Sequence, residues 1–197
     1  RGTPLGTMEG HTGEVSSLVF MPDRRTLVSA GARLRFWDIV TRGPKPVFAH
    51  NPSMGVNAVA IAPSGHTLAV GQWSHDVALI DAASGNHVNT LAGHDEAGIF
   101  ALDYSPDGKY LVSAGTDHSV RVWDIVRGAH PSRELVGQAE RIAAVAATSD
   151  AGLLAAVSDD DRVILWQPAT SRLLATWTAG HGQIHCVAID ENHGRLF

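Results

Sequence analysis

The sequence predicts an all-β fold made of repeated four-stranded antiparallel sheets, and two observations support this. First, the segments "RFWDIV", "ALIDAA", "VRVWDI" and "VILWQP" place Trp37, Ile80, Trp123 and Trp166 at a constant spacing of 43 residues. Second, alternating apolar runs such as "VNAVAI" and "IAAVAA" are separated by turn sequences such as "SPDG", a pattern typical of short strands. About four strands of five or six residues fit within one repeat.

The repeats must pack against one another, because a four-stranded sheet cannot bury both of its faces alone. Radial stacking of such sheets gives a β-propeller, and a repeat of this length is typical of that architecture. We therefore expect a single propeller domain over residues 1–197, with about four complete blades and partial ones at the ends.

Composition narrows the range of partners. The chain has 197 residues and a net charge of -5, whereas nucleic-acid binding needs a concentrated basic surface. It also lacks the roughly 20 consecutive apolar residues that cross a bilayer, and its one cysteine, Cys186, cannot form an internal disulfide. We expect neither nucleic acid nor membrane as partner, and a cytoplasmic location by default. Because the chain starts at Arg1, a preceding export signal is compatible with it.

Dipeptides at fixed places in the repeat point to a known family. Gly-His pairs open three units, Trp-Asp pairs close two of them, and "SPDG" lies between the first two strands of the third unit. These motifs resemble the WD-repeat (WD40) β-propellers over essentially the whole chain, most closely in the third unit. The pairs are Gly10-His11, Gly93-His94, Gly180-His181, Trp37-Asp38 and Trp123-Asp124; the departures are Ala49-His50, Gly137-Gln138, Ile80-Asp81 and Trp166-Gln167.

The resemblance implies how the repeats map onto blades. In this family one repeat runs from an outer strand through the three inner strands of the next blade. The expected units are residues 5–43, 44–86, 87–129, 130–172 and a truncated 173–197. Leu5 to Met8 is then an outer strand, and a fifth blade begins at Ile184. We expect the chain to be a fragment of a longer propeller whose further blades cover apolar faces at both ends.

The resemblance also implies a buried hydrogen-bond network in the third unit. Carried over position by position, its members are His94, Ser113, Asp117 and Trp123. Their donors and acceptors can satisfy one another once buried, while the adjacent His118 and Ser119 are expected only to complete a turn. The first unit retains His11, Ser29 and Trp37 but is two residues shorter in this turn and loses the aspartate.

We interpret this serine, histidine and aspartate as structural, because the set recurs in decayed form once per repeat and catalytic triads are defined by geometry and role. His181, His185 and Cys186 match no zinc spacing, and His185 and Cys186 are expected on opposite faces of a strand. Asp159 to Asp161 lack the pattern of a calcium loop and are expected in a solvated turn. We predict no catalytic residue, no metal and no cofactor.

A partner is expected on the face that carries the loops between blades, as the resemblance implies. The candidate residues lie just before a first strand or in the turn between second and third strands: Glu14, Arg141, Gln183, Trp73, Thr116 and Asp159. Trp73 stands out because tryptophan is enriched among binding hot spots. The alternative is that its ring covers apolar surface at the blade edge.

The function we expect is a non-catalytic scaffold that binds a protein or peptide, with no small-molecule substrate. An alternative is a regulatory or sensor module of a larger chain, as in bacterial proteins that join such repeats to a kinase, NTPase or cytochrome domain. A third hypothesis, an enzyme that uses the central channel, finds only Asp103 and His185 as candidates on the first strands and is the weakest.

Overall fold

The computed structural model describes residues 3, 6–45, 55–95, 98–128, 131–135, 140–148, 152–178, 180, 184–190 and 195–197. Within them, the strands form four antiparallel sheets of four strands each and one two-stranded hairpin. We call the four-stranded sheets blades 1 to 4 in chain order.

The bounds of the strands are as follows. Blade 1 contains β1 (Ser17–Phe20), β2 (Thr26–Ala30), β3 (Arg35–Asp38) and β4 (Gly43–Pro44). Blade 2 contains β5 (Val56–Ile61), β6 (Thr67–Gln72), β7 (Val77–Asp81) and β8 (His87–Leu91). Blade 3 contains β9 (Ile99–Tyr104), β10 (Tyr110–Gly115), β11 (Val120–Asp124) and β12 (Pro131–Leu135). Blade 4 contains β13 (Ile142–Ala147), β14 (Leu154–Ser158), β15 (Arg162–Gln167) and β16 (Arg172–Thr178), with a 3-10 turn, η1 (Pro168–Thr170), before β16. The hairpin contains β17 (Ile189–Asp190) and β18 (Arg195–Leu196).

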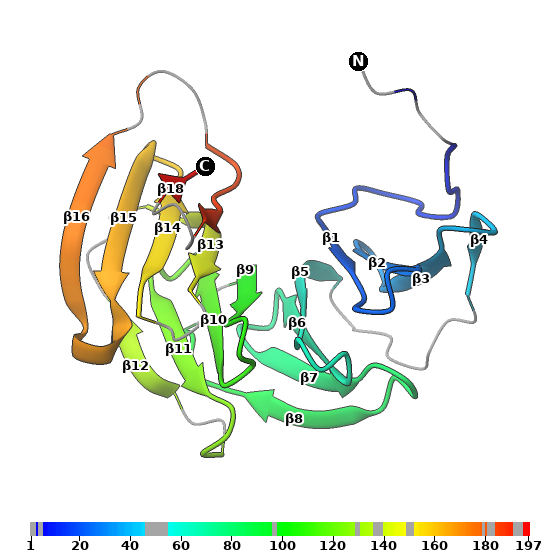
Figure 1. Ribbon diagram of the computed structural model, residues 1–197, viewed down its shortest axis with the longest axis horizontal. Helices are drawn as coiled ribbons and strands as arrows, with labels where there is room; N and C mark the ends of the chain where they lie inside the picture. Colours follow the sequence, from blue (N-terminus) through cyan, green and yellow to red (C-terminus); the bar gives the residue numbers. More distant parts are fainter. Residues whose placement is uncertain are drawn as a thin grey trace.

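The blades are arranged around a common centre. Within each blade the strands lie in chain order, and the first strands of neighbouring blades contact each other, β1 with β5, β5 with β9 and β9 with β13. Figure 1 shows the blades following one another along an arc, from blue blade 1 to yellow and orange blade 4, with these first strands on the inner side. The predicted all-β architecture of four-stranded propeller blades is confirmed, while the exact repeat-unit boundaries stay a prediction.

The "SPDG" sequence forms the tight turn between β9 and β10. The Ser105 hydroxyl donates to the Asp107 carboxylate (2.7 Å) and accepts the backbone N–H of Tyr110 (3.0 Å). Gly108 has a φ of 72°, a left-handed conformation that glycine adopts without steric cost. The turn residues therefore fix where the first strand ends and the second begins.

The hydrophobic core lies between blades, as expected for sheets that must pack face to face. One cluster joins blades 1 and 2, a second joins blades 2 and 3, and a third joins blades 3 and 4. Trp123 and Trp166, which lie 43 residues apart, belong to the second and third clusters and are almost completely buried. The repeat seen in the sequence is thus the repeat of the interface between blades.

The two ends of the described chain differ from the interior of the blades. Residues 6–8 form no strand, because an extended segment needs a hydrogen-bonded neighbour and none of the described strands pairs with them; Leu5 lies outside the described part, and the orphan outer strand expected at Leu5 to Met8 stays a prediction. In the last segment, Ala188 and Phe197 exchange both backbone hydrogen bonds (2.9 and 3.0 Å) and the strand itself starts at Ile189. His185 and Cys186 therefore precede the ladder, and the expectation that they alternate across a strand fails.

The end blades expose large apolar side chains. Leu18 and Phe20 of β1 are 60% and 59% exposed, and Leu173 and Trp177 of β16 are 50% and 45% exposed. These exposures agree with the expectation of further covering blades, which stays a prediction. In the part of the chain that the structure describes, no helix has the length and apolarity to cross a membrane.

Candidate functional site

The structure brings the four network residues of blade 3 together. The His94 imidazole lies 2.7 Å from the Asp117 carboxylate through Nδ1 and 2.7 Å from the Ser113 hydroxyl through Nε2. The Trp123 indole N–H donates to the same hydroxyl at 2.8 Å. With a proton on Nδ1, His94 donates to Asp117 and accepts from Ser113, so every donor in this hydrogen-bond network has an acceptor.

Ser119 belongs to this network, which corrects the expectation that it only completes a turn. Its side chain is buried, and its hydroxyl donates to the Asp117 carboxylate at 2.8 Å. Burial alone raises the pKa of Asp117, but the hydrogen bonds from His94 and Ser119 outweigh it and hold the pKa well below its usual range. Asp117 is thus a carboxylate at neutral pH and orients the imidazole. His118, by contrast, does occupy a turn position, with a φ of 61°.

Blade 1 contains the same network without its acid. His11 Nε2 lies 2.6 Å from the Ser29 hydroxyl, which also accepts the Trp37 indole N–H at 2.7 Å. The imidazole and indole rings are 6.0 Å apart and tilted by 46°, close to the 6.4 Å and 45° of His94 and Trp123. The histidine, serine and tryptophan of the network therefore adopt the same arrangement without an aspartate.

A second feature lies where the first strands begin, facing the centre of the arc. There, residues from all four blades and from the segment before β17 line a cavity of about 540 Å³, which we call the central opening. In every repeat, the second residue of the apolar run at the first strand lines this opening. These residues are Ser16, Asn57, Phe100, Ala143 and His185.

β-Bulges turn three of these side chains, those of Asn57, Phe100 and Ala143, toward the central opening. Val56 pairs with Gln72 and Ala58 with Gly71, so Asn57 has no partner in β6. Phe100 and Ala143 are skipped in the same way in blades 3 and 4. A bulge leaves one residue outside the ladder and redirects its side chain. The inner end of each of these three strands therefore presents a residue to the opening instead of to a neighbouring blade.

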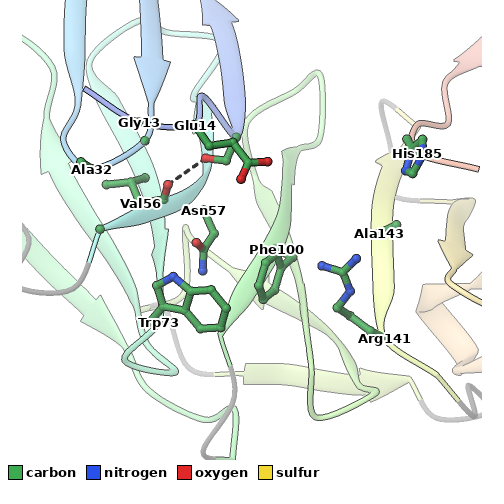
Figure 2. Close-up of a pocket in the computed structure, with 13 residues that line it drawn as sticks. Gly13, Glu14, Ala32, Val56, Asn57, Trp73, Phe100, Arg141, Ala143 and His185 are labelled. Atoms are coloured by element: carbon green, nitrogen blue, oxygen red, sulfur yellow. Dashed lines mark hydrogen bonds between the residues drawn. The ribbon is translucent and has the colours of Figure 1, made fainter. Parts of the chain in front are cut away.

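Aromatic and charged side chains meet on one side of the central opening. Trp73, which follows β6, makes an edge-to-face contact with Phe100 (ring centroids 5.0 Å apart, 89°). The Arg141 guanidinium lies 4.7 Å from the Phe100 ring on its other side, and Figure 2 shows the three side chains in this order. Arg141 also donates two hydrogen bonds to Asp159, at 2.8 and 3.2 Å. Trp73, Phe100 and Arg141 therefore form a row in which Phe100 contacts both of the other side chains, and Asp159 holds the arginine in place.

Asn57 adds a polar group without a partner. It is 8% exposed, and its amide nitrogen Nδ2 is buried without a hydrogen-bond partner among the described residues. Figure 2 shows the amide between Trp73 and Phe100 on one side and Val56 on the other. A buried donor left unpaired costs about 1–3 kcal/mol.

Of the predicted partner-face residues, Trp73, Glu14 and Arg141 line the central opening. Asp159 reaches it indirectly, as the partner of Arg141. Thr116 is not among the lining residues; its backbone N–H bonds to the carbonyl of Gly98 at 3.1 Å. Gln183 lies outside the described residues.

Sequence reasoning missed Phe100 and Asn57 as lining residues. The candidates predicted from the sequence lie just before a first strand or in a turn, whereas Asn57 and Phe100 lie inside the alternating run of the strand itself. The signal in the sequence is that the residue type at this repeat position changes from unit to unit: it is phenylalanine in one, asparagine in another, and serine, alanine or histidine in the rest.

The residues named for a channel enzyme are not brought together at this site. His185 lines the central opening but Asp103 does not; instead, Asp103 accepts the backbone N–H of Ala147 in blade 4 at 3.0 Å. Among the described residues, no group of three or more histidine, cysteine, aspartate or glutamate side chains is arranged to hold a metal ion.

Comparison with known proteins agrees with this geometry. Residues 2–38 and 85–124 match the family described as WD domain, G-beta repeat. Among solved structures, 1553 chains match; one, titled "Structure of U3-55K", superimposes with a TM-score of 0.81 at 25% sequence identity over 92% of this chain. The chain spans 57% of the length of that protein. No curated protein sequence matches significantly.

WD40 repeats generally mediate protein–protein interactions, and the family is generally non-catalytic. The two matched regions are the units built around Trp37 and Trp123, whose histidine, serine and tryptophan form the hydrogen bonds described above. These matches and the shared propeller fold show that the chain contains WD40 repeats at residues 2–38 and 85–124.

Proposed function

We propose that this chain is a non-catalytic scaffold that binds a protein or peptide partner at the central opening. The observation that carries the proposal is the convergence there of an exposed tryptophan, a phenylalanine, an arginine and an unpaired amide, contributed by three different blades. Such a mixture suits a polypeptide, which offers both apolar side chains and backbone hydrogen-bonding groups.

The aromatic pair provides the apolar anchor. Trp73 is 54% exposed, although Phe100 supports its ring and Gly98 lies directly beneath it. Gly98 has no side chain, and a Cβ added there would approach a Trp73 ring carbon to 2.9 Å. An aromatic ring held in place before binding loses little conformational freedom when a partner covers it. Tryptophan and arginine are also the residue types most enriched at binding hot spots.

The polar groups of the central opening would orient a bound partner. Glu14 offers an exposed carboxylate as acceptor across the central opening, and Asn57 lines the opening with an amide whose Nδ2 is buried. Arg141 is already paired with Asp159, so its charge is largely neutralised and its planar group serves as a stacking surface for a partner. A partner that crosses the opening can therefore contact blades 1, 2 and 4 at once.

Trp73→Ala tests the proposal. With a partner identified by affinity purification of the intact protein, we expect the dissociation constant to rise by about 10-fold to 100-fold, as for a hot-spot residue. The melting temperature should fall only slightly, because the lost Phe100 contact is worth about 0.5–1.5 kcal/mol. Isothermal titration calorimetry and thermal denaturation measure the two effects.

Trp177→Ala is the matched control, since Trp177 is exposed to a similar degree, 45%, but lies on outer strand β16. We expect it to leave the affinity unchanged. If both variants weakened binding equally, or if Trp73→Ala lowered only the melting temperature, the partner would not bind at the central opening.

A further inference from the structure

The shortened turn of blade 1 leaves a space that blade 3 fills. From Ser113 to Asp124 the chain passes through Asp117, whose carboxylate contacts His94. From Ser29 to Asp38 the chain is two residues shorter and contains no acid before Asp38. In place of the aspartate, arginines stand at position 33 in this turn and at position 35, where β3 begins.

A pocket of about 240 Å³ occupies this place, and we call it the blade 1 pocket. It is lined by His11, Thr12, Ala32, Arg33 and Arg35. Its volume is below the roughly 300–1,000 Å³ typical of small-molecule sites, so it suits a single small group. Ala32 also lines the central opening, and the two cavities therefore adjoin.

His11 has one ring nitrogen to offer to this pocket. Nε2 is bonded to Ser29, while Nδ1 has no hydrogen-bond partner in the described part of the chain. A Cβ added at Gly31 would lie 3.1 Å from that Nδ1. At the equivalent Gly115 of blade 3, an added Cβ would lie 3.3 Å from the carboxylate oxygen Oδ1 of Asp117. The imidazole of blade 1 thus faces the turn on the side where blade 3 carries its acid.

The charge around the blade 1 pocket is positive and uncompensated. Neither Arg33 nor Arg35 forms an ion pair with another described residue, although the whole chain carries a net charge of -5. The Arg35 guanidinium packs against the Trp37 ring, 6.0 Å from its centroid. Burial and then the charge of Arg35 lower the pKa of His11, as expected when a histidine lies beside a cation without a neighbouring acid.

We propose that the blade 1 pocket binds the carboxylate of an acidic side chain in trans, in the place that Asp117 fills in blade 3. Arg33 and Arg35 supply charge-assisted donors, and His11 Nδ1–H supplies the hydrogen bond that His94 gives to Asp117. Carboxylate is preferred over phosphate, because blade 1 has the same histidine, serine and tryptophan arrangement that holds the Asp117 carboxylate in blade 3.

Free acetate is the probe. In the intact protein labelled at histidine, acetate added at constant ionic strength against chloride should shift the His11 ring resonances in NMR spectra, with saturation in the millimolar range. His11→Gln assigns the signal. We expect Arg33→Gln and Arg35→Gln each to weaken acetate binding about tenfold, the value of one hydrogen bond to a charged group. Because no partner protein is used, this result is independent of binding at the central opening.

Arg24→Gln is the control: it makes the same charge change at an exposed turn of the same blade, away from the pocket. Replacing Ala32 and Arg33 with the blade 3 sequence Thr116–Ser119 supplies an internal carboxylate and should abolish the acetate response. A response that does not saturate, equal effects of Arg24→Gln and Arg33→Gln, or saturation by phosphate but not by acetate would overturn the proposal. Arg33 is exposed, so its variant tests the site even if Arg35→Gln fails to fold.

Discussion

Replacing Ser113 with alanine will lower the free energy of unfolding by about 2–4 kcal/mol, because two buried groups lose their partner together. The Ser113 hydroxyl is fully buried, accepts the Trp123 indole N–H at 2.8 Å and lies 2.7 Å from His94 Nε2. Alanine fits the space but offers neither function, so one donor and one acceptor remain without water. Urea denaturation followed by tryptophan fluorescence measures the change.

Two further serines calibrate this result. Ser64→Ala removes an exposed hydroxyl and should change the free energy of unfolding by less than about 0.5 kcal/mol. Ser29→Ala removes the equivalent hydroxyl of blade 1 and should cost less than Ser113→Ala, since His11 is only half-buried and water can replace the lost partner. An unchanged unfolding midpoint for Ser113→Ala would mean that the network does not stabilise blade 3.

Replacing Asp103 with asparagine will stabilise the protein at pH 7.5 by about 1–3 kcal/mol, at about 1.4 kcal/mol per unit of pKa shift. Burial raises the pKa of Asp103 to about 6, although backbone hydrogen bonds from Ala147 and Tyr104 oppose the rise. The folded protein therefore binds a proton between about pH 4 and pH 6 that the unfolded chain has released, and stability falls as the pH rises through this range. Above it, the folded state carries a charge at a site that disfavours it.

Asparagine removes that charge and keeps a carbonyl oxygen to accept the Ala147 N–H. The gain in stability should therefore be present at pH 7.5 and vanish near pH 4, where the Asp103 carboxyl is already neutral in the folded state.

Asp107→Asn is the contrasting control: burial there is outweighed by hydrogen bonds from Ser105 and Lys109, which lower the pKa of Asp107. Its contribution is present above about pH 4, so this variant should be less stable than the parent at pH 7.5. If Asp103→Asn were equally stabilising at pH 4 and 7.5, the charge of Asp103 would not be the cause.

The positions that follow from chemistry within one repeat could be predicted from the sequence. His94, Ser113, Asp117 and Trp123 form a consistent set of donors and acceptors, and the structure places them within hydrogen-bond distance. Ser119 was missed because its role depends on the turn conformation at His118, which brings the serine hydroxyl back to Asp117. A turn sequence indicates that the chain reverses; it does not indicate which side chains return toward the core.

At the central opening, too, some lining residues could be predicted from the sequence and others could not. Glu14, Trp73 and Arg141 were predicted on one face because the resemblance to WD40 repeats implies that their places in the repeat lie there. Phe100 and Asn57 were not, because a residue in an alternating run is assigned to one face of the sheet by counting, and a bulge interrupts that count. The bulges become visible only in the pairing of β5 with β6 and of β9 with β10.

By itself, the sequence determined the repeat of 43 residues, the strand-and-turn order within it and, through these, the propeller architecture, because periodic burial leaves a periodic pattern of apolar residues. Only the tertiary structure decided which side chains share a site. Asn57 and Phe100, from different blades, join Trp73 and Arg141 at the central opening because radial packing brings equivalent strand ends to one centre, and that convergence depends on distances between repeats that no single repeat encodes.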